Sequence, residues 1–335
     1  MITVAVVGAG YWGKNIVRTM AALPDARLKY IVDSSESVRT AYNQLAGTIV
    51  TDDYRTVLND REVDAVMIAT PPVTHHALAS AALDAGKHVF IEKPMTLEVP
   101  HAEDLVARAE SLDLRLMVGH LLLYHPCVTA MKNHIDNGDI GDVYYFYCQR
   151  LNLGKVRSDE NALQSFAPHD ISVALYLIGE SPVTVSATGS AYLQKNIEDV
   201  SFVNLHFPGG QIAHIHVSWL DPHKVRRATV VGSKKMMVFD DMEPREKIRI
   251  YDKGVDISGE YGSYGEFLSL RDGNIHIPVI QMSEPLCLEC KHFISSVETG
   301  VPPLSDGYNG LLVTRVLDAA QSSLKSGGIP VRIVG

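Results

Sequence analysis

The stretch that decides the fold is Ile2-Thr-Val-Ala-Val-Val-Gly-Ala-Gly-Tyr-Trp-Gly-Lys-Asn-Ile-Val-Arg18. Its first part, Ile2–Val7, is rich in β-branched residues and predicts a strand buried on both faces, as in a parallel sheet. Gly8, Gly10 and Gly13 follow in the spacing G-x-G-x-x-G, and an apolar pattern typical of a helix comes after them. This order of strand, glycine turn and helix predicts a pyrophosphate site at the start of the helix.

Each glycine has its own expected role. Gly8 allows the tight turn, Gly10 lets the backbone approach the pyrophosphate, and Gly13 lets the helix pack close to the strand. A second apolar strand, Leu28–Asp33, ends in an acid where the ribose diol needs a carboxylate acceptor. An ordinary solvated aspartate is the alternative for this position taken alone, but the combined pattern predicts that the chain binds a dinucleotide.

The end of this second strand favours NAD as the cofactor. The anionic Asp33 would repel the 2′-phosphate of NADP, and the next residue is Ser34 rather than an arginine. Inside the glycine turn, Tyr11 and Trp12 are expected to contact the pyrophosphate and the ribose through their backbone and rings.

Composition excludes several classes of protein. The chain has 335 residues, enough for about two domains, and its 46% hydrophobic and 21% charged residues are typical of a soluble globular protein. The formal net charge of −9 argues against a nucleic-acid partner. No apolar run approaches the roughly 20 residues needed to cross a membrane, and no targeting segment precedes the first strand.

Cysteine and histidine usage predicts a reduced, cytoplasmic protein without a metal. Four scattered cysteines are too few for a disulfide framework. Cys287 and Cys290 form a single C-x-x-C within a helical pattern, where buried thiols on a core face are the favoured interpretation over a metal or redox site. Three histidine pairs come without the carboxylate or thiolate ligands that would complete a metal site: His75 with His76, His120 with His125, and His214 with His216.

The pattern of elements predicts two domains. Strands and helices alternate through Gly119, which indicates right-handed βαβ units and a mostly parallel sheet. Beyond His120, helices and a polar loop over Asn152–Gln164 accompany runs with strand character. The expected strands lie in Val143–Leu151, Val183–Leu193, Val200–Phe207, Gln211–Leu220, Ala228–Asp240 and Lys247–Asp252, and the expected helices are Ile171–Ile178, Glu284–Thr299 and Asp306–Ser326. We therefore predict an α/β protein with a Rossmann domain, a doubly wound parallel sheet, at residues 1–120. An α+β domain with an open, mostly antiparallel sheet, for substrate binding and oligomerisation, is predicted at residues 121–335.

The carboxyl ends of the predicted parallel strands are where ligands bind in such sheets. Asp33, Thr70 and Glu92 all fall at those ends. Pro94 fixes the turn after Glu92 and leaves Lys93 at this edge, beside the expected nicotinamide. A lysine that extends along the surface into solvent is the alternative.

The glycine motif, Ala69-Thr70-Pro71 with His75, and Glu92-Lys93-Pro94 together resemble the Gfo/Idh/MocA oxidoreductases, in order and spacing over the whole chain. The resemblance implies a Rossmann domain followed by an open antiparallel sheet domain. It also implies that the cofactor is contacted beyond the glycine turn, by Asp33, Ser34, Thr70, Pro71, His75, Glu92 and Lys93.

The resemblance further implies a histidine in the first long helix of the second domain, which is His169 here. Ser165 stands where many members carry an aspartate four residues before this histidine, and Leu121–Tyr124 lacks the arginine that often precedes the crossover proline. A position near the start of the helix, with Asp170 in the first turn, is the alternative interpretation of His169.

The chemistry of alcohol oxidation assigns roles to the Lys93 and His169 side chains. The reaction removes a hydride and a proton, and an imidazole with an ordinary pKa of about 6.5 suits that proton near neutral pH. An ammonium beside the oxygen stabilises developing alkoxide charge. We therefore expect His169 to act as general acid/base and Lys93 to orient and polarise the hydroxyl, with the roles partly exchanged if Lys93 loses its proton.

The polar loop before His169 bears on the substrate. It looks like the branch of the family that oxidises nucleotide sugars at C3, such as the UDP-N-acetylglucosamine 3-dehydrogenases. Lys155 and Arg157 would suit a diphosphate and Asn161 a sugar hydroxyl or acetamido group, with Asp170 also near the substrate. A solvated loop or a subunit contact is the alternative for each residue taken singly.

Three hypotheses follow. The first is NAD-dependent oxidation of a UDP-N-acetylhexosamine at C3. The second is a dehydrogenase or 3-ketoreductase of a free sugar, inositol or another nucleotide sugar. The third is a non-catalytic dinucleotide-binding protein, against which the presence of Lys93 and His169 argues. The open sheet face needs covering and predicts a homodimer or homotetramer.

Overall fold

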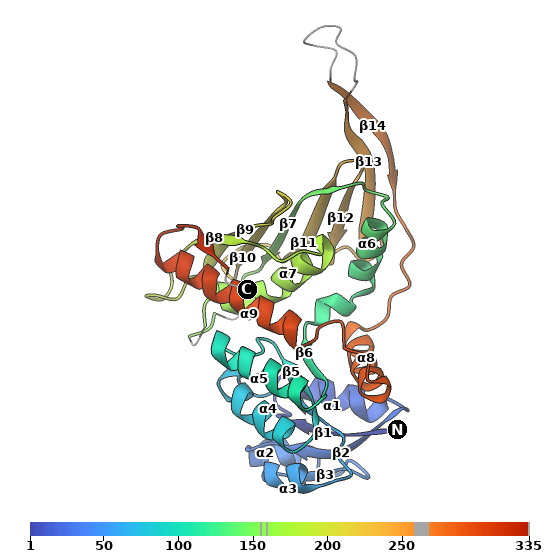
Figure 1. Ribbon diagram of the computed structural model, residues 1–335, viewed down its shortest axis with the longest axis vertical. Coiled ribbons are helices and arrows are strands. Elements are labelled where there is room, and N and C mark those ends of the chain that lie inside the picture. The colour runs from blue at the N-terminus through green and yellow to red at the C-terminus, as the bar shows by residue number, and fades with distance from the viewer. Residues whose placement is uncertain (155, 159, 258–267, 334–335) are drawn as a thin grey trace. The chain divides into compact units, whose positions relative to one another are not determined.

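The computed structural model describes residues 1–154, 156–158, 160–257 and 268–333, and Figure 1 labels its elements. The chain divides into two compact units. The first contains Met1–Tyr124 and Ser283–Arg315, and the second contains His125–Met282 and Val316–Gly335. This grouping differs from a division at residue 120, because the segment Ser283–Arg315 returns to the first unit.

The first unit contains a six-stranded sheet in the order β3-β2-β1-β4-β5-β6, in which every neighbouring pair is parallel. This order reverses between β1 and β4, as in dinucleotide-binding Rossmann folds. The strands are β1 Ile2–Val7, β2 Ala26–Val32, β3 Ile49–Thr51, β4 Ala65–Ile68, β5 His88–Glu92 and β6 Leu116–Gly119. The helices between them are α1 Gly13–Ala22, α2 Glu36–Thr40, α3 Tyr54–Asn59, α4 His75–Asp84 and α5 Val99–Ser111. The predicted doubly wound sheet is confirmed.

The segment Ser283–Arg315 completes the first unit. It contains α8, Pro285–Thr299, and the start of α9, Gly307–Lys325. Phe293 of α8 packs edge-to-face on Phe90 of β5, with ring centroids 5.8 Å apart. The Val118 N–H donates to the Ser305 carbonyl at 2.7 Å, and the Ser305 hydroxyl donates to the Val118 carbonyl at 2.7 Å. The returning chain therefore continues the hydrogen bonding of the sheet beyond β6.

The second unit contains a nine-stranded sheet in the order β14-β13-β12-β11-β7-β10-β9-β8-β15. Its neighbours are antiparallel except for the parallel pair β7 and β10, so the predicted mostly antiparallel sheet is confirmed. The strands are β7 Val143–Leu151, β8 Thr184–Ser190, β9 Val200–His206, β10 Ile212–Ser218, β11 Val225–Gly232, β12 Met236–Asp240, β13 Ile248–Ile257, β14 Leu268–His276 and β15 Val331–Arg332.

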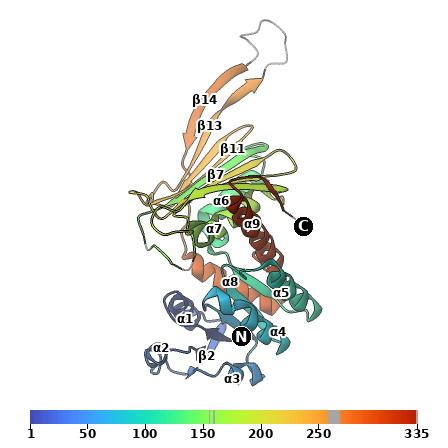
Figure 2. The ribbon, with the colours of Figure 1, turned by 90° about the vertical axis from the view of Figure 1, so that its left-hand side faces the viewer.

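Helices α6, Pro126–Asp136, and α7, Ala162–Ile178, lie on one side of this sheet (Figure 2). The buried residues Phe146 and Cys148 of β7 alternate with Tyr145 and Tyr147, which remain 43% and 37% exposed. The sheet therefore has one covered and one uncovered face.

Helix α7 begins earlier than expected, so the predicted loop over Asn152–Gln164 is wrong at its end. The Asn161 side chain accepts a hydrogen bond from the Gln164 N–H at 3.0 Å, and the Gln164 side chain accepts one from the Asn161 N–H at 3.4 Å. This reciprocal cap starts the helix at Ala162. Pro168 lies inside the helix, although proline usually ends one.

The sequence patterns do not predict some helices and strands, and they predict two strands as one. The predicted strand over Ala228–Asp240 is two strands, β11 and β12, because the chain turns where the Gly232 N–H donates to the Lys235 carbonyl at 3.0 Å. Helix α6 was missed although it begins with a proline and its first N–H groups are capped by His125, which accepts from the Cys127 N–H at 3.2 Å. The strands β14 and β15 were also missed.

Among the described residues, none of the helices has both the length and the apolar character needed to cross a membrane.

Candidate functional site

The glycine turn connects β1 to α1 at the carboxyl edge of the first sheet. Gly8 has a φ of +86°, and a Cβ there would lie 2.7 Å from the Ala69 carbonyl oxygen. A Cβ on Gly13 would lie 1.9 Å from the Gly8 carbonyl oxygen, whereas a Cβ on Gly10 would meet no atom within 4 Å. Packing therefore requires glycine at positions 8 and 13, and Gly10 leaves open space beside the backbone, as the approach of a pyrophosphate requires.

Asp33 follows β2 and binds the glycine turn. Its Oδ2 accepts a hydrogen bond from the Ala9 N–H at 2.8 Å, and its Oδ1 accepts one from the Ser35 N–H at 2.9 Å. A carboxylate offers about four acceptor positions, so Asp33 retains capacity for a ribose diol. Ser34 is exposed beside it, and Arg39 donates to the carbonyls of Asp33 and Ser34 at 2.8 and 2.9 Å.

Tyr11 and Trp12 have different environments. Tyr11 is 90% exposed, with the Lys14 Nζ 5.6 Å from its ring centroid. The Trp12 indole N–H donates to Glu92 Oε1. The polar atom of the Trp12 ring is therefore used inside the protein, and its backbone and ring faces are what remains for a cofactor.

Glu92 ends β5 and connects three parts of this edge. Besides the bond from Trp12, its Oε2 accepts one from the Lys93 N–H at 3.2 Å. A Cβ on Gly119 would lie 3.1 Å from the Glu92 carboxylate, so this glycine makes room for it. Burial raises the pKa of Glu92 to about 7, against the opposing effects of the Trp12 hydrogen bond and the Lys93 charge. Lys93 itself is half-buried.

His75 is the first residue of α4 and has no exposed surface. Its Nδ1 lies 2.9 Å from the Pro94 carbonyl oxygen and its Nε2 lies 2.9 Å from the Thr70 carbonyl oxygen. Burial lowers its pKa, while these backbone carbonyls act in the opposite direction. Both ring nitrogens thus face the backbone of the protein rather than a ligand. Pro71, after Thr70, is exposed.

Sequence reasoning assigned no role to Glu289 and His120, two buried titratable side chains of the first unit. Glu289 of α8 has no exposed surface, and neither carboxyl oxygen has a hydrogen-bond partner among the described residues. Burial, and then the nearby Glu92 charge, raise its pKa well above the usual range, so it is a neutral acid. His120 follows β6, and burial, then the Lys93 charge, lower its pKa to about 3.

His169 belongs to the second unit, where it is half-buried within α7. Because α7 begins at Ala162, the alternative that placed Asp170 in the first helical turn is wrong. Asp170 is buried, and its Oδ2 and Oδ1 accept hydrogen bonds from the Arg150 Nε and Nη2 at 2.7 and 2.8 Å. This two-bond pair joins α7 to β7.

Asn161 and Arg157 are the other predicted substrate contacts that the structure describes. Asn161 caps α7 and also donates to Glu198 at 2.7 Å and Gln321 at 3.0 Å, so its polar atoms are already used. Arg157 is exposed and pairs with Glu160 at 2.8 Å. Lys155 lies outside the described residues. The side chains of Asn161 and Asp170 therefore stabilise the second unit, and the proposed substrate site does not include them.

No group of three or more His, Cys, Asp or Glu side chains arranged to hold a metal occurs in the part of the chain that the structure describes. The absence of a metal stays a prediction. On α8, Cys290 is buried and Cys287 half-buried, close to the core-face position that the helical pattern predicts.

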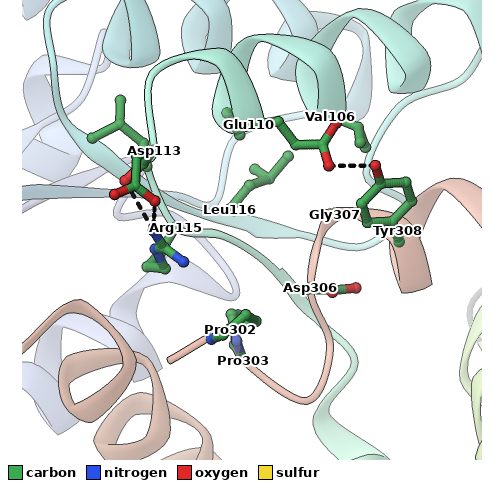
Figure 3. Close-up of a pocket in the computed structure, with 12 residues that line it drawn as sticks. Val106, Glu110, Asp113, Arg115, Leu116, Pro302, Pro303, Asp306, Gly307 and Tyr308 are labelled. Atoms are coloured by element: carbon green, nitrogen blue, oxygen red, sulfur yellow. Dashed lines mark hydrogen bonds and ion pairs between the residues drawn. The ribbon is translucent and has the colours of Figure 1, made fainter. Parts of the chain in front are cut away.

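One pocket of about 290 Å³ lies at the opposite edge of the first sheet (Figure 3). Leu116, the first residue of β6, contributes to it, as do Pro302, Pro303 and the Tyr308 ring, whose hydroxyl donates to Glu110. Because ligands of a Rossmann sheet bind at the carboxyl ends of the strands, this pocket is separate from the dinucleotide site.

The glycines provide a test of the dinucleotide site. We expect Gly10→Ala to fold normally but to bind NAD at least about 10-fold more weakly, because its methyl group fills the space beside the backbone. Gly13→Ala is the contrasting variant, in which the clash with the Gly8 carbonyl lowers the melting temperature. Calorimetric titration with NAD and thermal unfolding measure the two effects. Unchanged NAD affinity in Gly10→Ala would contradict this use of the turn.

Comparison with known proteins agrees with this geometry. Residues 2–120 match an oxidoreductase family with an NAD-binding Rossmann fold, and residues 128–238 match the GFO/IDH/MocA C-terminal domain. A solved structure from Magnetospirillum magnetotacticum, described as an oxidoreductase, is 30% identical with a TM-score of 0.80, covering 95% of this chain and 99% of the other.

Two named enzymes are also similar. The UDP-N-acetylglucosamine 3-dehydrogenase of Acidithiobacillus ferrooxidans is 29% identical over 260 residues, or 77% of each chain. Its solved structure aligns with a TM-score of 0.82 at 25% identity, over 97% of this chain and 98% of the other. The scyllo-inositol 2-dehydrogenase (NAD(+)) of Bacillus subtilis is 25% identical over 346 residues, 98% of this chain and 95% of the enzyme. The chain therefore belongs to the Gfo/Idh/MocA family and is an oxidoreductase whose Rossmann domain binds NAD.

Proposed function

We propose that this enzyme oxidises a secondary alcohol of a sugar, and that its substrate is a UDP-N-acetylhexosamine-type nucleotide sugar oxidised at C3. The observation that carries the proposal is Lys93, held at the carboxyl end of β5 by the Glu92 contact in an NAD-binding Rossmann unit. The similarity to the UDP-N-acetylglucosamine 3-dehydrogenase, and the exposed Arg157 in the loop before α7, support the nucleotide sugar.

The mechanism assigns a role in the chemical step to each of two residues, Lys93 and His169. NAD, when bound, supplies the acceptor for the hydride of the alcohol carbon. The Lys93 ammonium orients the hydroxyl and stabilises the negative charge that develops on its oxygen. The His169 imidazole accepts the hydroxyl proton in its neutral form and returns it in the reverse reaction. Arg157 pairs with the diphosphate of the substrate.

A second substrate class has its own support. The inositol dehydrogenase relative aligns over nearly the whole of both chains, whereas the nucleotide-sugar relative aligns by sequence over 77% of each. A cyclic polyol or a free sugar therefore remains the alternative substrate for the same two catalytic residues.

Turnover of a substrate panel tests the function. With NAD and a panel of UDP-N-acetylglucosamine, UDP-N-acetylgalactosamine, UDP-glucose, myo-inositol and free N-acetylglucosamine, we expect NADH absorbance to rise with the UDP-N-acetylhexosamines. Turnover of inositol alone would replace the proposed substrate.

The variant Lys93→Ala tests the role of the lysine. It should keep NAD affinity nearly intact and lower kcat roughly 100-fold or more, because one oriented electrostatic group is lost. Full turnover by Lys93→Ala would exclude the proposed role of Lys93.

A pH–rate profile tests His169. If the neutral imidazole accepts the proton, kcat/KM for oxidation falls as the pH drops through roughly 6 to 7, where imidazole becomes protonated. His169→Asn preserves the approximate size but cannot accept the proton, so it should lose most activity together with this limb. An active His169→Asn enzyme with the wild-type profile would transfer the role to another group, with Lys93 the next candidate.

We also infer a homodimer or homotetramer, assembled through the uncovered face of the second sheet in the cytoplasm. By strand register, this face carries Tyr145 and Tyr147 of β7 beside Ile212 and His214 of β10, with Phe202 of β9 stacked on His216 at 4.3 Å. Such an exposed apolar patch is typical of an interaction surface. Tyr147→Glu should shift the mass measured by sedimentation velocity towards a monomer. A wild-type monomer at micromolar concentration would refute the inference.

A further inference from the structure

His75 connects the ends of two neighbouring strands. Thr70 follows β4 and Pro94 follows β5 by two residues, and their carbonyl oxygens lie 2.9 Å from the two ring nitrogens of His75. No part of His75 is exposed, so bulk water does not compete for either contact. The ring is therefore a fixed bridge between the strand ends that flank the expected nicotinamide site.

The number of protons on the His75 ring determines to which carbonyls it can donate. A neutral imidazole carries one N–H, and a carbonyl can only accept, so the neutral ring donates to one carbonyl and presents a lone pair to the other. The ring donates to both carbonyls at once only when it carries a second proton, and burial, which lowers the pKa of His75, disfavours that state. A neutral ring therefore donates to the Pro94 carbonyl only when its proton is on Nδ1, and this tautomer holds the turn after β5 by a hydrogen bond.

We propose that His75 is a positioning residue that holds the Lys93–Pro94 turn against the end of β4 and thereby sets the place of the Lys93 side chain. Pro94 is the next residue after Lys93, so a shift of its carbonyl moves Lys93 directly. On the other side, the Lys93 backbone N–H donates to Glu92 Oε2 at 3.2 Å. The inference rests on the proposed role of Lys93 in the reaction.

The adjacent residue on the same helix provides a matched control. His76 is also a histidine of the first turn of α4, but its Nε2 binds Asp104 at 2.7 Å and its ring stacks on His101 at 4.1 Å. It contacts neither strand end through these interactions. Substitution of His76 by leucine therefore changes a histidine of α4 without removing the bridge.

Hydrogen exchange of the cofactor-free protein tests the bridge without any turnover. In His75→Leu, which has a similar volume but no donor, we expect the peptide covering residues 92–97 to exchange at least about 10-fold faster. His76→Leu should exchange as wild type. His75→Gln, whose amide can donate to one carbonyl, should lie between the two. Wild-type exchange of this peptide in His75→Leu would overturn the proposal.

Steady-state kinetics of the NAD-bound enzyme test the positioning role. We expect His75→Leu to lower kcat roughly 100-fold, because a small displacement of a reacting group is that costly, while NAD affinity stays within about threefold. His75→Gln should recover part of kcat, and His76→Leu should match wild type. A loss of NAD affinity with unchanged kcat would make His75 a cofactor residue instead and refute the proposal.

Two further arms keep the outcomes separate. If Lys93→Ala retains full turnover, the proposed role of Lys93 fails. If Lys93→Ala is inactive while His75→Leu is fully active, only the His75 inference fails. Should His75→Leu not fold, ring ¹H–¹⁵N spectra of the wild-type protein decide: a protected His75 ring N–H is expected, and one that exchanges like free imidazole would overturn the bridge.

Discussion

The close approach of α1 to the turn before it is the constraint on which the first unit depends. With 1.9 Å between a hypothetical Gly13 Cβ and the Gly8 carbonyl oxygen, no other residue fits at position 13. The same turn presses on the end of β4, because a Cβ on Gly8 would collide with Ala69, and it is bound to the end of β2 through Asp33. The ends of three strands are therefore set by one turn, and His75 extends this fixed edge to the turn after β5.

Burial determines which charges remain at this edge. His120 is neutral near Lys93, so it adds no positive charge beside the lysine. Glu289 is a neutral acid, so any negative charge on the pair of Glu289 and Glu92 lies on Glu92. Because two carboxylates in one apolar site do not ionise together, Glu92, with a pKa of about 7, is the member of this pair that ionises first. The Lys93 charge thus acts on two groups of this edge, Glu92 and His120.

The sequence predicts the first unit well because its signals are local. A β-branched run before a glycine motif, and an acid at the next strand end, each need only a few neighbouring residues to be recognised. The start of α7 was also encoded locally, since Asn161 and Gln164 have the spacing of a reciprocal cap, but the polar composition of the loop obscured it. Because the Asn161 side chain caps α7, it is no longer a candidate substrate contact.

The burial of Glu289 could not be predicted in this way. A glutamate in an amphipathic helix usually faces solvent, and this one is buried only because α8 packs on a sheet formed almost two hundred residues earlier. The pairing of Asp170 with Arg150 has the same origin, since it depends on α7 lying against β7. Long-range packing determines the burial of Glu289 and the pairing of Asp170 with Arg150, and no local sequence pattern indicates either.

The split of the first unit between two chain segments has a consequence for its synthesis. Residues 1–124 leave the ribosome first, but Phe293, which covers Phe90, and Ser305, which pairs with β6, belong to the returning segment. At about 5–20 residues per second, Phe293 follows Tyr124 by on the order of 10–30 s. During that interval the part of the nascent sheet that α8 covers is exposed and β6 is an unpaired edge strand. Exposed apolar surface and unpaired strand edges are what a neighbouring nascent chain can misassemble with.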